Sequence, residues 1–244
     1  MGKKGQQKHL KRFTMPKVMR LPRKAEVWAV KPKSGPHSGK AAMALREVIR
    51  DTLHLAGTAK EADKILSEGR VLVDGRVRTN PKFPIGFMDV VSIPETGKHY
   101  RVLYDSLHRL ILNEIPESEA NFKLCRVSGK SIVKGNKIQL EFHDGKTCVG
   151  EFKDFRLSDV AKISLPDFKV MDRIPFGEGA EAIVIGGANV SKLGKIEGVE
   201  PMKGRRPDLI NMKDGDDSFK APKNYVFVVG SDKPLISISG GNSE

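Results

Sequence analysis

The 244-residue sequence has little of what zinc proteins, membrane proteins and secreted proteins depend on. Its two cysteines, Cys125 and Cys148, form no Cys-x-x-Cys pair, which excludes zinc fingers and zinc ribbons. A single disulfide between the two cysteines is possible, but a reducing compartment disfavours it. The favoured interpretation is that both cysteines are small buried residues in strands. No apolar run approaches the roughly 20 residues of a membrane span, and no apolar segment follows the basic amino terminus as in a secretory signal. We therefore expect a soluble intracellular protein with no membrane partner.

Catalytic signatures are also missing. The sequence has no Gly-x4-Gly-Lys-Ser/Thr loop and no Gly-x-Ser-x-Gly elbow, and its six histidines show no metal-binding spacing. Residues 177–182 fit a Gly-x-Gly-x-x-Ala dinucleotide pattern, but 183–187 read as a strand and turn, whereas that pattern must open a helix. Ser131 and Lys134 fit Ser-x-x-Lys without its companion motifs. The sequence thus predicts no enzyme, no cofactor, no metal and no small-molecule substrate.

Positive charge is abundant and unevenly placed. The chain holds 43 Lys and Arg against 30 Asp and Glu, a formal net charge of +13 at pH 7. Residues 1–40 hold twelve of the basic residues and one acid, Glu26, so the other 204 residues are nearly neutral. A polycationic segment beside a neutral body indicates a polyanionic partner.

Residues 1–40 are predicted to be a basic extended tail, because their isolated apolar residues follow no helix or strand period. Phe13 and Trp28 lie among the cations, and aromatic rings stack on bases while Lys and Arg meet phosphates. A solubilising tail and an arm on an anionic membrane are the alternatives, but four prolines disfavour the amphipathic helix of a membrane arm. The tail residues predicted to bind RNA are Lys3, Lys4, Lys8, His9, Lys11, Arg12, Lys17, Arg20, Arg23, Lys24, Lys31 and Lys33.

Two helices and a small hairpin are predicted next. Within 41–56, apolar residues recur at i, i+3, i+4 and i+8 and make one helical face. Thr58 and Glu61 fit a capping box that starts a second helix, and Gly69 is placed to end it. The Asp-Gly pair at 74–75 then marks a tight hairpin turn. The strands predicted around and after that turn are 71–73, 76–78 and 89–93.

From residue 100 onward the sequence is predicted to be almost all β, with strands and turns spaced as in small barrels or sandwiches. The break between two β-units is placed between Pro166 and Pro175. Turn signals occur at Ser128-Gly129, Gly135-Asn136, Asp144-Gly145, Gly186-Gly187 and Asp214-Gly215. The predicted strands are 109–113, 121–127, 131–133, 137–142, 146–152, 160–165, 182–186, 194–199, 207–212, 225–229 and 235–239.

A strand that runs into a glycine turn, at 182–187, is followed by Gly194-Lys195-Ile196 at the start of another strand. This pattern resembles the KOW motif of small SH3-like barrels, which bind RNA or protein. Ser191 and Lys192 stand where that motif often has a glycine. The resemblance implies an SH3-like barrel and leaves open whether its partner is RNA or protein.

The residues 69–78, after two helices, resemble the S-four (S4) RNA-binding domain. Together with 9–12, 16–17, 34–37 and 84–91 they resemble one family, the archaeal and eukaryotic small-subunit ribosomal proteins S-four-e (S4e). The length resembles archaeal members. The resemblance implies an α+β multidomain chain in which an S4-type domain is followed by two mainly β domains. The implied divisions are a tail at 1–40, the S4-type domain at 41–99, a central β-domain at 100–170 and a KOW-type barrel with C-terminal strands at 171–244.

The same resemblance implies a structural constituent of the small ribosomal subunit, in the cytoplasm, that binds rRNA and supports subunit assembly and translation. Neighbouring ribosomal proteins are the other implied partners. It further implies RNA contact by basic residues of the two helices and the hairpin, here Arg46, Arg50, Lys60, Lys64, Arg70, Arg76 and Arg78.

Two alternatives stay open. One is an RNA-modifying enzyme that uses the S4-type domain for targeting. Residues 108–111 resemble the His-Arg-Leu-Asp stretch of one family of RNA pseudouridine synthases, but Ile111 stands in place of the nucleophilic aspartate. The other is a non-structural, RNA-binding translation or ribosome-associated factor.

Overall fold

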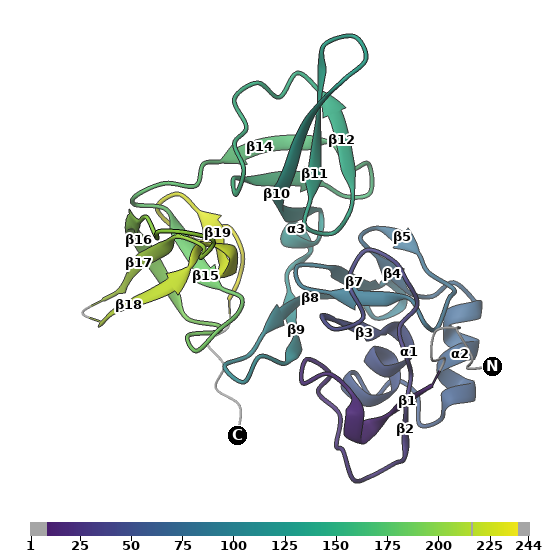
Figure 1. Ribbon diagram of the computed structural model, residues 1–244. Helices are drawn as coiled ribbons and strands as arrows, with labels where there is room; N and C mark the ends of the chain where they lie inside the picture. The colour runs from purple at the N-terminus through teal and green to yellow at the C-terminus, as the bar shows by residue number, and fades with distance from the viewer. Residues whose placement is uncertain (1–8, 216, 239–244) are drawn as a thin grey trace, which may run out of the picture.

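The computed structural model describes residues 9–215 and 217–238 and confirms the predicted α+β class (Figure 1). An S4-type unit lies at the lower right of the view, a central β-sheet at the top and a small β-barrel at the left. Within the described residues, none of the helices combines the length and apolar character needed to cross a membrane. The predicted RNA-binding residues Lys3, Lys4 and Lys8 lie outside the described residues.

The N-terminal segment folds into a loop on the S4-type unit. Strand β1 (Leu10–Lys11) pairs antiparallel with β2 (Trp28–Ala29), and a 3-10 turn, η1 (Arg12–Thr14), follows β1. The prediction of an extended tail is wrong for this part, because its scattered apolar residues meet across the loop and not along one element. Its small core is formed by Met15, Met19 and Leu21.

The first predicted helix is shorter than expected. Residues 42–44 form β3 (Ala42–Ala44), which pairs with β6 (Pro84–Gly86), so the helix begins only at α1 (Leu45–Glu47). It continues as a wider π-helical turn, η2 (Val48–Thr52), and ends there. The prediction of a helix over 41–56 is therefore wrong at both ends: strand pairing with β6 replaces its first turn, and the helical stretch already ends at Thr52.

The second helix, α2 (Ala59–Ser67), confirms the predicted start. The Thr58 side chain accepts a hydrogen bond from the backbone N–H of Glu61, and the Glu61 carboxylate accepts one from the N–H of Thr58. Gly69 follows the helix with a φ of 75°, the left-handed conformation that glycine allows at a helix end.

The predicted hairpin turn is confirmed, and its sheet is larger than expected. Asp74 and Gly75 have φ values of 52° and 73°, as a tight two-residue turn requires. The sheet has the order β5-β4-β7-β8-β9, so it continues across the predicted boundary between residues 99 and 100. Its strands are β4 (Leu72–Val73), β5 (Arg76–Val77), β7 (Val90–Ile93), β8 (Lys98–Tyr104) and β9 (Leu110–Ile115).

A short 3-10 turn, η3 (Pro94–Thr96), joins β7 to β8, and helix α3 (Glu117–Ala120) leads into the central sheet, whose order is β12-β11-β10-β13-β14. The predicted turn at Ser128-Gly129 is wrong: both residues lie inside β10, at a bulge where the pairing with β11 shifts register. The central strands are β10 (Phe122–Val133), β11 (Lys137–Phe142), β12 (Thr147–Gly150), β13 (Val160–Ser164) and β14 (Val170–Ile174). Since β14 pairs with β13, this sheet crosses the predicted boundary at residue 170.

The last unit is a five-stranded antiparallel half-barrel of order β18-β17-β16-β15-β19, which fits the expected SH3-like barrel. Residues 235–238 form no strand, contrary to prediction. Its strands are β15 (Glu181–Val184), β16 (Leu193–Glu200), β17 (Leu209–Asp214), β18 (Asp217–Pro222) and β19 (Val226–Gly230), with a 3-10 turn η4 (Lys223–Tyr225) before β19.

The three units all contribute residues to the main hydrophobic core, and the central sheet has a second core of its own. Phe87 of the S4-type unit meets Phe227 of the barrel edge-on at 5.1 Å between ring centroids, and His143 of the central unit lies 5.5 Å from the same Phe227 ring. Both cysteines are free thiols in strands: Cys125 is buried and Cys148 half-buried. The units are therefore packed against one another through a contact to which each unit contributes one aromatic side chain.

Candidate RNA interface

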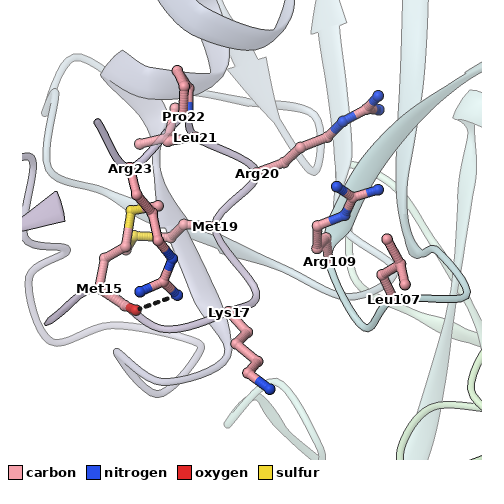
Figure 2. A pocket seen from close by; sticks show the side chains of 9 residues that line it. All are labelled: Met15, Lys17, Met19, Arg20, Leu21, Pro22, Arg23, Leu107 and Arg109. Atoms are coloured by element: carbon pink, nitrogen blue, oxygen red, sulfur yellow. Dashed lines mark hydrogen bonds between the residues drawn. The ribbon is translucent and has the colours of Figure 1, made fainter. Parts of the chain in front are cut away.

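A basic groove of about 760 Å³ lies between the N-terminal loop and the β8–β9 turn (Figure 2). Its cations are Lys17, Arg20 and Arg23 from the loop and Arg109 from the turn, and its lining includes no carboxylate residue. The remaining lining residues are Met15, Met19, Leu21, Pro22 and Leu107. The groove thus combines four positive side chains with an apolar floor, which suits a phosphate-bearing chain.

The loop side of the groove is fixed by hydrogen bonds. The backbone N–H of Leu110 donates to the carbonyl of Val18 at 2.9 Å, which ties the loop to the start of β9. The guanidinium of Arg23 donates to the carbonyls of Phe13 at 2.7 Å and Met15 at 3.3 Å. In Figure 2 Arg23 turns toward Met15, whereas Arg20 extends on the side where Arg109 lies.

The turn side of the groove is fixed by Asp105. Its carboxylate accepts hydrogen bonds from the backbone N–H groups of Leu107 and Arg109, and Arg109 Nε donates to it at 2.7 Å. Lys17 and Arg20 are exposed, and their side chains have no ion-pair partner within residues 9–215 and 217–238. Arg23 and Arg109 are therefore held in place, whereas Lys17 and Arg20 are available to an incoming anion.

Arg12 is the exception among the loop cations. Its side chain is 2 % exposed, and its guanidinium donates to the carbonyls of Trp28 at 3.2 Å and Pro22 at 3.0 Å and to the Glu26 carboxylate at 2.7 Å. In this fold the side chain of Arg12, a residue predicted to bind RNA, is buried because it closes the loop from inside. Nothing in the sequence distinguishes it from its exposed neighbours.

The helix cations predicted to contact RNA differ in availability. Lys60 and Lys64 on α2 are exposed. Arg46 binds the Asp63 carboxylate through two nitrogens, at 2.7 and 2.6 Å, and Arg50 binds Asp51 at 2.9 Å. An RNA phosphate that engages Arg46 or Arg50 must share it with these carboxylates.

The hairpin cations are also engaged within the protein. Arg70 pairs with Glu68 at 2.6 Å, and the guanidiniums of Arg76 and Arg78 lie 4.4 and 4.5 Å from aromatic ring centroids. The other predicted tail residues divide into exposed His9, Lys11, Lys24 and Lys33 and half-buried Lys31.

Two cations of the interface were not among the predicted RNA-binding residues. Arg109 lies in the basic groove, and Lys82 lines a smaller pocket next to Trp28 together with Lys31, Arg46 and Arg50. Arg109 sits in the stretch that resembles pseudouridine synthases, and Lys82 follows the predicted hairpin. Only the three-dimensional approach of the N-terminal loop marks either residue as part of a basic surface.

A buried charge cluster joins the S4-type and central units and plays a structural part. The Lys123 ammonium lies 2.9 Å from Asp74, 2.5 Å from Asp89 and 3.1 Å from Asp144. Burial opposes the charged amine, but the carboxylates of Asp89 and Asp74 outweigh it and raise the pKa of Lys123 well above its ordinary value. Within the described residues, no group of three or more His, Cys, Asp or Glu side chains is placed to hold a metal ion.

Three family models match this chain along most of its length. The RS4NT (NUC023) domain matches residues 4–40, the S4 domain matches residues 48–91, and the family described as Ribosomal family S4e matches residues 96–170. The order of these matches agrees with the order of loop, S4-type unit and central sheet.

Archaeal relatives match over nearly the full length. The small ribosomal subunit protein eS4 of Methanothermobacter thermautotrophicus is 43% identical over 96% of this chain and 97% of its own length. That of Methanosphaera stadtmanae is 42% identical over 99% of this chain and 100% of its own length. The crystal structure of the 30S ribosomal protein S4e from Thermoplasma acidophilum aligns with a TM-score of 0.69 and 36% identity, covering 78% of this chain and 96% of that one. Matches of this identity and coverage show that the chain belongs to the S4e family of ribosomal proteins.

Proposed function

We propose that this protein is a structural constituent of the small ribosomal subunit, that it acts in the cytoplasm, and that it binds rRNA through the N-terminal loop and the S4-type unit. The observation that carries the proposal is the basic groove, where Lys17, Arg20, Arg23 and Arg109 converge without a carboxylate in the lining. The family membership makes rRNA the polyanion that this groove is expected to meet.

The chemistry of the groove favours recognition of the RNA backbone by shape. Phosphate contacts position a protein on RNA and carry little sequence information. Arg23 and Arg109 are already held by carbonyls and by Asp105, so they lose little side-chain freedom when a phosphate arrives. Lys17 and Arg20 supply the adjustable contacts.

The central sheet and the barrel give the protein a nearly neutral surface besides the basic one. Outside residues 1–40 the chain is nearly neutral, so the central sheet and the barrel are not drawn to RNA by charge alone. We expect these units to meet neighbouring ribosomal proteins and to support assembly of the subunit. The exposed lysines Lys60 and Lys64 of α2 extend the RNA-binding surface of the S4-type unit.

The test is the salt dependence of binding to small-subunit rRNA. Each lost phosphate contact is expected to lower the slope of log K against log salt by about 1. We expect Lys17→Gln with Arg20→Gln to weaken binding and flatten the slope by roughly 1 to 2.

The matched control is Lys203→Gln with Arg205→Gln, which removes the same two residue types from an exposed loop of the barrel. This control should leave affinity and slope nearly unchanged. Equal slopes for the wild type and the groove variant would contradict RNA binding through the groove.

A further inference from the structure

We propose that Trp28 forms one wall of a pocket for a single unpaired RNA nucleotide, in which the base stacks on the indole and the phosphate meets the surrounding cations. The inference rests on the proposed function for the identity of the partner as RNA. It adds a base-stacking site, distinct from the basic groove, between the N-terminal loop and the first helix of the S4-type unit.

The exposure of Trp28 is the first observation. It is the only tryptophan of the chain, and 53% of its surface is open to solvent although most tryptophans are largely buried. The His9 ring lies 5.7 Å from it in a tilted arrangement, and Lys11 Nζ lies 5.9 Å from the ring centroid. Aromatic rings exposed among cations are the platforms on which proteins stack unpaired bases.

The lining of the pocket is the second observation. A space of about 290 Å³ opens beside Trp28, with Lys31, Arg46, Arg50 and Lys82 around it. Its one acidic lining residue, Glu26, already lies 2.7 Å from Arg12 and 3.8 Å from Arg50. An acidic peptide would use the cations but not the flat ring, whereas a nucleotide uses both.

The backbone around Trp28 is fixed in advance. Arg12 Nε donates to the Trp28 carbonyl at 3.2 Å, and Trp28 is paired with Lys11 in the β1–β2 sheet. The next residue but one, Val30, donates its N–H to the buried Glu47 carboxylate at 2.6 Å. A ring carried on such a rigid strand loses little conformational entropy when a base stacks on it.

The cations of the pocket differ in how they are held. Arg46 pairs with Asp63 at 2.6 Å and Arg50 with Asp51 at 2.9 Å, and these carboxylates outside the lining keep both arginines oriented. Lys82 is exposed, and its ammonium makes no ion pair within residues 9–215 and 217–238. We expect the nucleotide phosphate to lie on the Lys82 side of the pocket.

The first test uses Trp28 as its own reporter. Since it is the only tryptophan, the intrinsic indole emission of the full chain reports on this ring alone. We expect a single-stranded oligoadenylate to quench the emission, and an RNA duplex or inorganic polyphosphate to bind without comparable quenching. Binding of the single strand, followed by a labelled RNA, with no change in Trp28 emission would overturn the inference and leave the proposed function standing. Failure of every RNA to bind would overturn both.

The second test separates stacking from charge. Trp28→Leu should weaken binding of the single strand by about 5- to 150-fold, the equivalent of one lost stacked base, without changing the salt slope. Trp28→Phe should restore part of the affinity because it keeps a ring. Tyr225→Leu is the matched control, because Tyr225 is an exposed aromatic of the barrel that does not line the pocket. Wild-type affinity in Trp28→Leu, or an equal loss in Tyr225→Leu, contradicts the pocket.

Discussion

The guanidinium Nε of Arg12 lies 3.2 Å from the carbonyl oxygen of Trp28. A cation that the sequence places in a basic run is thus buried, and it holds the strand that carries the exposed indole. Arg12 contributes to the interface by shaping the loop, while Lys17 and Arg20 contribute by charge.

Replacing Arg12 by Leu should loosen the N-terminal loop. The change removes the hydrogen bonds that Arg12 donates to the part-buried carbonyls of Pro22 and Trp28, a cost of roughly 0.5 to 1.5 kcal/mol for each bond lost. We expect faster amide hydrogen exchange across residues 10–29 and unchanged exchange in the barrel. Arg20→Leu, at an exposed position of the same loop, is the control and should leave exchange as in the wild type.

Replacing Lys123 by Met should destabilise the whole chain. It leaves the carboxylates of Asp74, Asp89 and Asp144 buried without a central cation, and removing one partner of a buried pair costs about 3 to 5 kcal/mol. Urea unfolding followed by circular dichroism measures the loss. Lys134→Met at the exposed β10–β11 turn is the same substitution outside the cluster and should cost far less. Equal midpoints for the two variants would show that the cluster does not bind the units together.

Stability should fall as pH rises because of Glu47. Burial raises the pKa of this carboxyl from 4.5 to about 7, although the Val30 N–H bond lowers it in part. The folded state therefore binds more protons than the unfolded state between these two pH values, and stability decreases with pH across that window. The loss is on the order of 3 kcal/mol once the pH exceeds 7.

The Glu47→Gln variant isolates this effect. Its amide oxygen can still accept the Val30 N–H, but it has no charge to bury. The free energy of unfolding of the variant minus that of the wild type should be small near pH 4.5 and grow with pH up to about 7. A difference that stays constant with pH would mean that Glu47 ionises at its ordinary pKa.

His143 should make stability depend on pH in the direction opposite to Glu47. Its ring is enclosed by Phe87 and Phe227, its Nδ1 lies 3.2 Å from the backbone N–H of Arg126, and burial lowers its pKa to about 3. The unfolded chain then binds the extra proton between pH 6.5 and 3, so this histidine makes the folded state less stable as pH falls through that window. NMR should show a neutral His143 imidazole at pH 5 in the folded chain and a titration near 6.5 in urea. A charged ring at pH 5 in the folded state would contradict the packing described for the three units.

Local chemistry allowed part of the fold to be predicted. The Thr58–Glu61 capping box and the Asp74-Gly75 turn are set by neighbouring residues, and both occur where the sequence predicts them. Strand β8 was missed because its buried Arg101 breaks the apolar pattern. One nitrogen of that guanidinium, Nη2, donates to the carbonyls of Glu119 and Phe122, which only the fold brings near.

In the candidate interface too, some features could be predicted from the sequence and others depend on the fold. The sequence located the basic segment, because net charge is a property of composition. It could not separate Lys17, which is exposed, from Arg12, which is buried by carbonyls many residues away. Nor could it assign Arg109 or Lys82, because each joins the interface only when the N-terminal loop docks.

We propose above all that the protein is a structural part of the small ribosomal subunit. Sedimentation of a cell lysate through a sucrose gradient at about 0.5 M monovalent salt, where loose electrostatic contacts are lost, tests this proposal most directly. We expect one copy of the chain for each small-subunit rRNA, retained through the gradient. Release to the top of the gradient, or far less than one copy per subunit, would contradict it and indicate a transient RNA-binding factor.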